Sequence, residues 1–151
     1  PKLPFVIGVM GAGGPTDQYG PDKRRYLSTH QNFRDAMAAP AALPEFQGDV
    51  AAVLTEKYWD MELEALRAKE KTIKPKADEI QAAMKERKMS KEEGQKALDQ
   101  LYTGTFTATE LEILRDSVSN AEFHYLGSAR IMTRIGKAFA DAMAGMLKPR
   151  D

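Results

Sequence analysis

The chain contains no cysteine, only two histidines, and as many basic residues (22) as acidic ones (22). The lack of cysteine excludes disulfides, thiolate nucleophiles and thiolate metal sites. The two histidines, His30 and His124, lie far apart in the sequence, which disfavours a dedicated zinc site. The formal net charge of +0 gives no general attraction to nucleic acid or to an anionic membrane. We therefore expect no metal, no other cofactor and no nucleic-acid partner.

Long hydrophobic runs are also missing. No apolar stretch approaches the roughly 20 residues that cross a bilayer, so we expect a soluble chain without a membrane partner. A chain of 151 residues with 42% hydrophobic content is long enough to bury one core. The sequence therefore predicts one domain, or part of one.

Two short apolar runs, Pro4–Met10 and Asp49–Thr55, are typical of strands that are buried on both faces of a parallel sheet. A strand, a helix and a second strand in this order predict a right-handed crossover between parallel strands. The glycine-rich stretch Gly11–Pro15 follows the first run, and Trp59 and Asp60 follow the second. We therefore expect these residues at the same, carboxyl-terminal edge of the sheet.

The segment between the two strands predicts a helix. Ser28 stands where a capping-box residue would start it, and Phe33, Ala36 and Met37 recur on one face. Pro40 is expected to stop the helix.

From about Lys57 to Ser117 the chain is highly charged and has helical periodicity. Two further capping-box patterns, Ser90 with Glu93 and Thr107 with Glu110, predict helix starts within it. Because charges of both signs alternate along these helices, a solvated surface is favoured over a specific docking surface. We interpret this region as a helical insertion.

A last helix is predicted from about Ser128 to Leu147, and Gly136 within it is expected to permit close approach of a packing partner. Its apolar stripe consists of Ile131, Ile135, Phe139 and Met143.

The glycines between Gly8 and Gly14 follow a strand, as they do in dinucleotide-binding domains. The required spacing G-x-G-x-x-G is not met, however, and Pro15 and a long loop intervene before the helix. The stretch fits a glycine-lined wall of another active site, or a plain tight turn. A small nucleotide-binding domain is kept as a minor alternative, which a ligand-induced thermal shift would test.

His124 stands at the predicted start of the last helix. Its ordinary pKa, near 6.5, suits a general base at neutral pH. A structural role accounts for the residue equally well on composition alone. His30, in a polar setting, fits a surface or capping role.

A catalytic base needs a nucleophile and an orienting acid. The sequence contains no G-x-S-x-G elbow and no G-D-S or G-Q-S-N block, and its serines stand at predicted caps and turns. Glu122 is close to His124 in the sequence, and Asp60 is expected at the same sheet edge. Asp17 and Asp116 remain open as alternatives.

Several stretches occur in the order that characterises one hydrolase family: Pro4–Gly11, Asn32–Ala36, Pro44–Phe46, Thr55 with Tyr58–Asp60, and His124–Ala129 with Ile135–Ala138. By these stretches the chain resembles the carboxyl-terminal half of the sialate O-acetylesterase-type family, which belongs to the SGNH (GDSL-like) hydrolases and is related to carbohydrate esterase family six. The resemblance implies a serine nucleophile in an amino-terminal G-Q-S-N-like block and a carboxyl-terminal histidine base, a position that matches His124. Two features depart from the superfamily: the nucleophile block is absent, and Ala121 stands where a D-x-x-H pattern would have its aspartate.

We therefore expect residues 1–151 to be the carboxyl-terminal part of one SGNH-like hydrolase domain. The predicted fold is α/β and helix-rich overall, a partial flavodoxin-like parallel sheet with a helical insertion at about 57–117. The expected function is that of a carbohydrate O-acetylesterase fragment that is inactive on its own. The expected catalytic residues are His124, Asp60 and Glu122, and the expected substrate-binding residues are Gly11, Gly13, Gly14, Trp59 and Tyr125.

The expected partners are an acetylated carbohydrate and either the missing amino-terminal half or another copy of the chain. Two strands leave sheet edges that need cover, so we expect either additional strands that these patterns do not reveal or association with another chain. The resemblance implies a periplasmic or secreted location. The alternative from another class is a non-catalytic helical module that binds a protein partner. A conspicuous apolar patch along the charged helices would favour that alternative.

Overall fold

The computed structural model describes residues 3–147, which form two compact units. The first, here called the sheet unit, comprises residues 3–60 and 119–147, and the second, the helical unit, is Met61–Val118. Helices dominate the described part of the chain, and the two strands within it form a small parallel sheet, so the α/β, helix-rich class is confirmed at this level. The helical unit covers nearly the same residues as the insertion expected at about 57–117.

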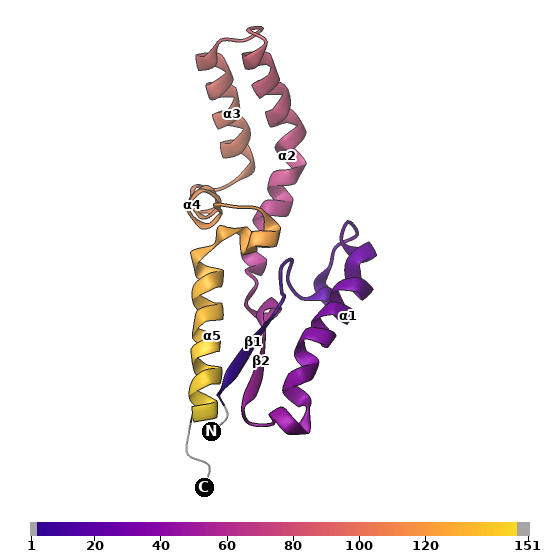
Figure 1. The fold of residues 1–151 in the computed structure, drawn as a ribbon. Coiled ribbons are helices and arrows are strands. Elements are labelled where there is room, and N and C mark those ends of the chain that lie inside the picture. The colour runs from indigo at the N-terminus through magenta and orange to yellow at the C-terminus, as the bar shows by residue number, and fades with distance from the viewer. Residues whose placement is uncertain (1–2, 148–151) are drawn as a thin grey trace. The chain divides into compact units, whose positions relative to one another are not determined.

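The sheet unit is built around two parallel strands, β1 (Phe5–Val9) and β2 (Val50–Leu54). Helix α1 (Leu27–Ala38) and helix α5 (Ala129–Leu147) each contact both strands. Figure 1 shows the two strands lying between these helices. This is the β-α-β order that the sequence predicted, with a second helix covering the sheet.

The strand register begins with Phe5 opposite Val50 and continues for five consecutive pairs. Because side chains alternate along a strand, Phe5 and Val9 share one face of β1 while Gly8 belongs to the other. A Cβ atom at Gly8 would lie 2.7 Å from the ring of Phe139. The glycine therefore lets helix α5 pack directly on the strand.

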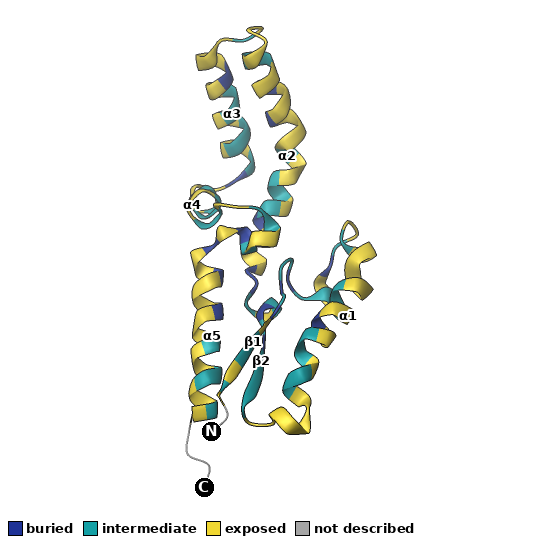
Figure 2. Cartoon of the chain, viewed as in Figure 1, coloured by how far each residue is buried: buried dark blue, intermediate teal, exposed yellow. Residues whose placement is uncertain are grey.

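The core of the sheet unit forms where α5 meets the two strands, and buried residues follow one side of α5 in Figure 2. The predicted apolar stripe is confirmed, because Ile131 is fully buried and Ile135 is 7% exposed. The expectation for Gly136 is wrong, since a Cβ atom there would meet no described atom within 4 Å. The buried apolar residues of this unit are Val9, Tyr19, Val53, Trp59, Leu126, Ile131, Ile135 and Ala138.

Helix α1 differs from its prediction in its start and in its buried face. It begins at Leu27, directly after a 3₁₀ turn η2 (Arg24–Tyr26), so Ser28 lies inside the helix and caps nothing. Phe33 is 54% exposed and Ala36 is exposed, whereas Arg34 is buried. The helix turns this charged side inward because Arg34 binds the chain that follows β1.

Three helices make up the helical unit: α2 (Met61–Lys85), α3 (Lys91–Thr105) and α4 (Ala108–Ser117). Both predicted capping boxes are confirmed, because Ser90 and Thr107 each accept the backbone N–H three residues on while the glutamate there binds back. Among residues 3–147, no helix combines the length and the apolar character that membrane crossing needs.

Candidate functional site

Three segments of the sheet unit meet at the carboxyl-terminal edge of the strands. The first is Gly11–Gly14, here called the glycine loop, which follows β1. The second is the 3₁₀ segment η5 (Thr55–Tyr58), which follows β2. The third is the 3₁₀ segment η6 (Glu122–Gly127), which contains His124 and precedes α5. Hydrogen bonds join all three.

The hydroxyl of Tyr125 links the three segments. The Gly11 N–H donates to this oxygen over 2.9 Å, and Thr55 Oγ1 lies 2.7 Å from it. Because the Thr55 hydroxyl donates to the Val9 carbonyl over 2.6 Å, the Tyr125 hydroxyl must donate to Thr55. Tyr125 thus fixes η6 to the ends of both strands.

Gly11 is a point of close backbone approach. A Cβ atom there would overlap the backbone N–H of Glu56, so no side chain fits. The close approach brings η5 against the glycine loop and leaves the Gly11 N–H buried. Its hydrogen bond to Tyr125 satisfies that donor.

The backbone of η6 is left-handed at three consecutive residues, Tyr125 (φ 52°), Leu126 (φ 59°) and Gly127 (φ 60°). For each of the two residues with a Cβ this conformation costs about 1–2 kcal/mol. Burial of Leu126, which is 2% exposed, offsets part of that cost. Its carbonyl accepts the N–H groups of Ser119 (2.9 Å) and Asn120 (3.0 Å). Such strain persists only where the surroundings determine the conformation, and it clusters at functional sites.

This turn leaves the side-chain rings of Phe123 and His124 exposed. His124 is exposed and Phe123 is 72% exposed, and their ring centroids lie 4.4 Å apart. The His124 N–H donates to the Ala121 carbonyl over 3.0 Å, which closes the start of the turn. The backbone of His124 is therefore fixed, while its imidazole ring remains accessible.

The two expected catalytic carboxylates are engaged by cations. Glu122 forms an ion pair with Lys23 at 2.6 Å. Asp60, with 5% of its side chain exposed, binds Arg130 at 3.0 Å. Neither ion pair includes His124, so an acid role for Glu122 or Asp60 remains a prediction.

The two other carboxylates that the sequence left open as candidate acids have surroundings less suited to that role. Asp17 is exposed in the 3₁₀ turn η1 (Thr16–Gln18). Asp116, in the helical unit, is bound by Arg115 Nε at 2.7 Å, and this hydrogen bond holds the pKa of Asp116 below its usual range.

The expected substrate-binding residues differ in their surroundings. Trp59 is 4% exposed and packs on Gly14, where a Cβ atom would lie 2.8 Å from its ring. It also contacts the Tyr125 ring, with centroids 6.0 Å apart. Gly11 is buried, whereas Gly13 is partly exposed beside the carboxylate of Glu122. These residues are brought together, and most of them serve as the packed wall of the site.

Arg34 is a residue of this site that the sequence did not reveal. It is 2% exposed and binds three carbonyls around the glycine loop, from Nε to Met10 (2.8 Å) and from Nη2 to Ala12 (3.2 Å) and Gly14 (3.0 Å). Its Nη1 forms an ion pair with Glu56 at 2.5 Å. A buried arginine with these partners fixes the loop, and no local pattern could have revealed it, because the three carbonyls lie 20 or more residues away in the sequence.

His30 is linked to Arg34 through the hydroxyl of Tyr19. Its Nδ1 lies 2.8 Å from the Tyr19 hydroxyl, which also accepts a hydrogen bond from Arg34 over 3.2 Å. The Tyr26 ring stacks on the imidazole with centroids 5.5 Å apart. His30 therefore supports the loop.

Among the described residues, no group of three or more His, Asp or Glu side chains is arranged to hold a metal ion. The chemistry that this arrangement can support is proton transfer by the exposed imidazole beside a rigid loop. Comparisons with known protein families, with curated proteins and with solved structures gave no match to this chain.

Proposed function

We propose that this chain is the carboxyl-terminal part of an SGNH-like carbohydrate O-acetylesterase, in which His124 is the general base and then the general acid. The observation that carries the proposal is the left-handed turn of η6, anchored through Tyr125, which presents His124 at the carboxyl-terminal edge of two parallel strands. Ligands of open α/β sheets bind at this edge.

The chemistry is acyl transfer in two steps. A serine hydroxyl attacks the ester carbonyl while His124 takes its proton, and the imidazolium then protonates the departing sugar oxygen, which leaves as a hydroxyl group. Water attacks the acetyl-serine in the second step, again with His124 as base, and acetate leaves as the serine regains its proton. The sequence has no nucleophile block, so we place the serine on a segment outside this sequence.

The acid that orients the imidazole is proposed to be Glu122 or Asp60. Glu122 is partly exposed, with 38% of its side chain accessible, and would have to release Lys23. Asp60 is buried and would have to release Arg130. Glu122 has the lower barrier to such an exchange, because its side chain is more exposed than that of Asp60 and water can more readily replace the lost ion pair.

Among residues 3–147, no strand pairs with the second edge of β1, and this edge supports the need for a second segment. The Phe5 N–H donates to the Asp49 carbonyl over 2.8 Å, so alternation along the strand turns the peptide groups of Val6 and Gly8 away from β2. Gly8 is exposed although Phe139 covers its face, which means that its backbone edge is open. Unpaired edges of this kind accept a further strand.

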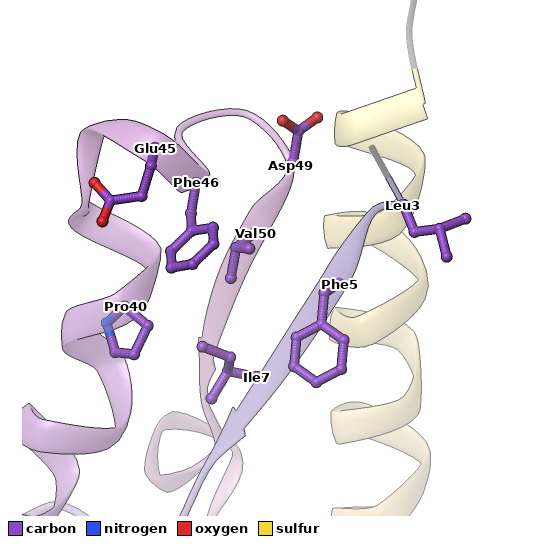
Figure 3. Close-up of a pocket in the computed structure, with 8 residues that line it drawn as sticks. All are labelled: Leu3, Phe5, Ile7, Pro40, Glu45, Phe46, Asp49 and Val50. Carbon is purple, nitrogen blue, oxygen red and sulfur yellow. The ribbon is translucent and has the colours of Figure 1, made fainter. Parts of the chain in front are cut away.

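An apolar groove adjoins the same strand. Figure 3 shows Phe5 and Ile7 of β1 facing Phe46 and Pro40 across it, and its volume is about 630 Å³. Parallel sheets are rarely stable with two strands, and their faces are normally covered. Edge and groove together support pairing with the amino-terminal half of the domain or with another copy of the chain.

The experiment measures acetate released from an O-acetylated carbohydrate by the gene product that joins this chain to its serine-bearing segment. His124→Ala is expected to lower kcat by about 10²- to 10⁴-fold, the usual contribution of a general base. His30→Gln is the matched control and should retain most of the activity, because a glutamine oxygen can still accept the hydrogen bond of the Tyr19 hydroxyl. Equal losses in the two variants would overturn the assignment of His124. The chain without that segment is expected to release no acetate.

The helical interaction module receives less support. Within Met61–Val118 the only large apolar side chain that is exposed is Met61, at 39%. The surface elsewhere in this unit carries ion pairs such as Lys74 with Asp78 and Lys76 with Glu79. This composition favours a solvated surface over an apolar docking patch.

A further inference from the structure

Phe123 is the most exposed aromatic side chain among residues 3–147, at 72%. A single exposed apolar residue is ordinary on a protein surface. What distinguishes Phe123 is its place, directly before the proposed base, with its ring centroid 4.4 Å from that of His124. The chain thus puts an exposed apolar ring beside the imidazole of the proposed base.

The backbone on both sides of Phe123 is fixed. Before it, the Asn120 N–H donates to the Leu126 carbonyl over 3.0 Å. After it, the Tyr125 hydroxyl is held by the Gly11 N–H at 2.9 Å, and the Ala121 carbonyl accepts the N–H groups of His124 (3.0 Å) and Leu126 (3.1 Å). A ring on such a segment keeps its position without being buried.

The chemistry of a phenyl face selects the ligand class. Its negative quadrupole attracts C–H groups, and it offers no hydrogen bond. A pyranose ring has an apolar face of C–H groups, which matches this surface, and its hydroxyls at the rim remain free for water. A straight alkyl alcohol has no flat face to cover the ring.

We propose that Phe123 is a specificity-determining residue, whose ring stacks against the apolar face of the acetylated sugar while His124 acts as the base in hydrolysis of the ester on that sugar. This inference rests on the proposed function and adds to it the recognition of a pyranose ring by one named side chain.

The first arm of the test is binding, measured on the chain itself by NMR titration with methyl 6-O-acetyl-α-D-glucopyranoside. The ring resonances of Phe123 should shift, and Phe123→Ala should weaken binding by about two- to tenfold, the range of an aromatic contact. Phe123→Trp should restore it. Phe33→Ala is the matched control, because Phe33 is 54% exposed on α1 and should not affect the titration. Equal binding by Phe123→Ala and the wild type would overturn the inference.

The second arm is selectivity, measured on the gene product that includes the serine. The ratio of kcat/KM for the sugar acetate to that for n-butyl acetate should fall about two- to tenfold in Phe123→Ala, mainly through KM. An unchanged ratio with both rates reduced would assign Phe123 to holding His124 and overturn the inference. If the wild type hydrolyses neither ester, the proposed function fails. The NMR titration then decides by itself whether Phe123 binds a sugar.

Discussion

Tyr125→Phe removes one oxygen atom and leaves the ring in place, so it isolates the link between η6 and the strands. The Gly11 N–H, which is buried, loses its acceptor, and Thr55 Oγ1 loses a donor while keeping its bond to the Val9 carbonyl. A buried donor without a partner costs about 1–3 kcal/mol. We therefore expect the free energy of unfolding to fall by about 2 kcal/mol. For a chain of 151 residues this corresponds to a Tm lower by roughly 4–8 °C.

Two measurements check this expectation. Thermal unfolding gives the change in Tm, and amide hydrogen exchange by NMR should show faster exchange at the Gly11 N–H than in the wild type. Tyr26→Phe is the matched control, because Tyr26 is 41% exposed and its ring stacks on His30 through its face. Its stability should change by no more than about 0.5 kcal/mol. If both variants lose the same stability and Gly11 exchanges as in the wild type, the Tyr125 hydroxyl does not anchor the turn.

Two further predictions concern the packing of each unit. Arg34→Met should lower the free energy of unfolding, measured by urea denaturation, by at least about 3 kcal/mol. The substitution leaves the Glu56 carboxylate without its buried cation and removes the hydrogen bonds that hold the glycine loop. A loss of stability below about 1 kcal/mol would contradict this reasoning. Hydrogen bonds from the Ser90 hydroxyl, and to a lesser extent from the Ser90 N–H, lower the pKa of Glu93. This capping box therefore stabilises α3 fully at pH values above about 4.3, the ordinary pKa of glutamate, and the stabilisation is lost as the pH falls through the lowered pKa. Ser90→Ala should therefore lower the Tm more at pH 6 than at pH 3 in circular-dichroism melts, and an equal difference at both pH values would refute the linkage.

The parts of the fold that the sequence predicted correctly depend on local patterns. Each strand is a short apolar run, and Ser90 and Thr107 each meet a glutamate three residues later. The apolar stripe of α5 repeats at helical spacing, so Ile131 and Ile135 could be assigned to the core. In all these cases neighbours in the sequence decide the structure.

The parts that escaped prediction depend on contacts between distant residues. Arg34 is buried only because carbonyls of the glycine loop, 20 or more residues away, replace its hydration. The left-handed turn has Tyr125 and Leu126 where a local pattern would call for glycine or asparagine. The anchoring of Tyr125 to Gly11 and Thr55, together with the burial of Leu126, stabilises that conformation.

The candidate site was predicted in part for the same reason. The order of the strands put the glycine loop and Trp59 at one edge of the sheet. The carboxylates could not be assigned from the sequence, because the partners of Asp60 and Glu122, Arg130 and Lys23, come from separate elements.

Chemical rescue tests the central claim most directly. In a protein that joins this chain to the proposed serine-bearing segment, His124→Ala should release acetate from an O-acetylated carbohydrate at about 10²- to 10⁴-fold below the wild-type rate. Added imidazole should restore part of that rate, because a free base can occupy the place of the missing side chain. A His124→Ala variant that keeps the wild-type rate, or a low rate that imidazole does not raise, would contradict the assignment of His124 as the base.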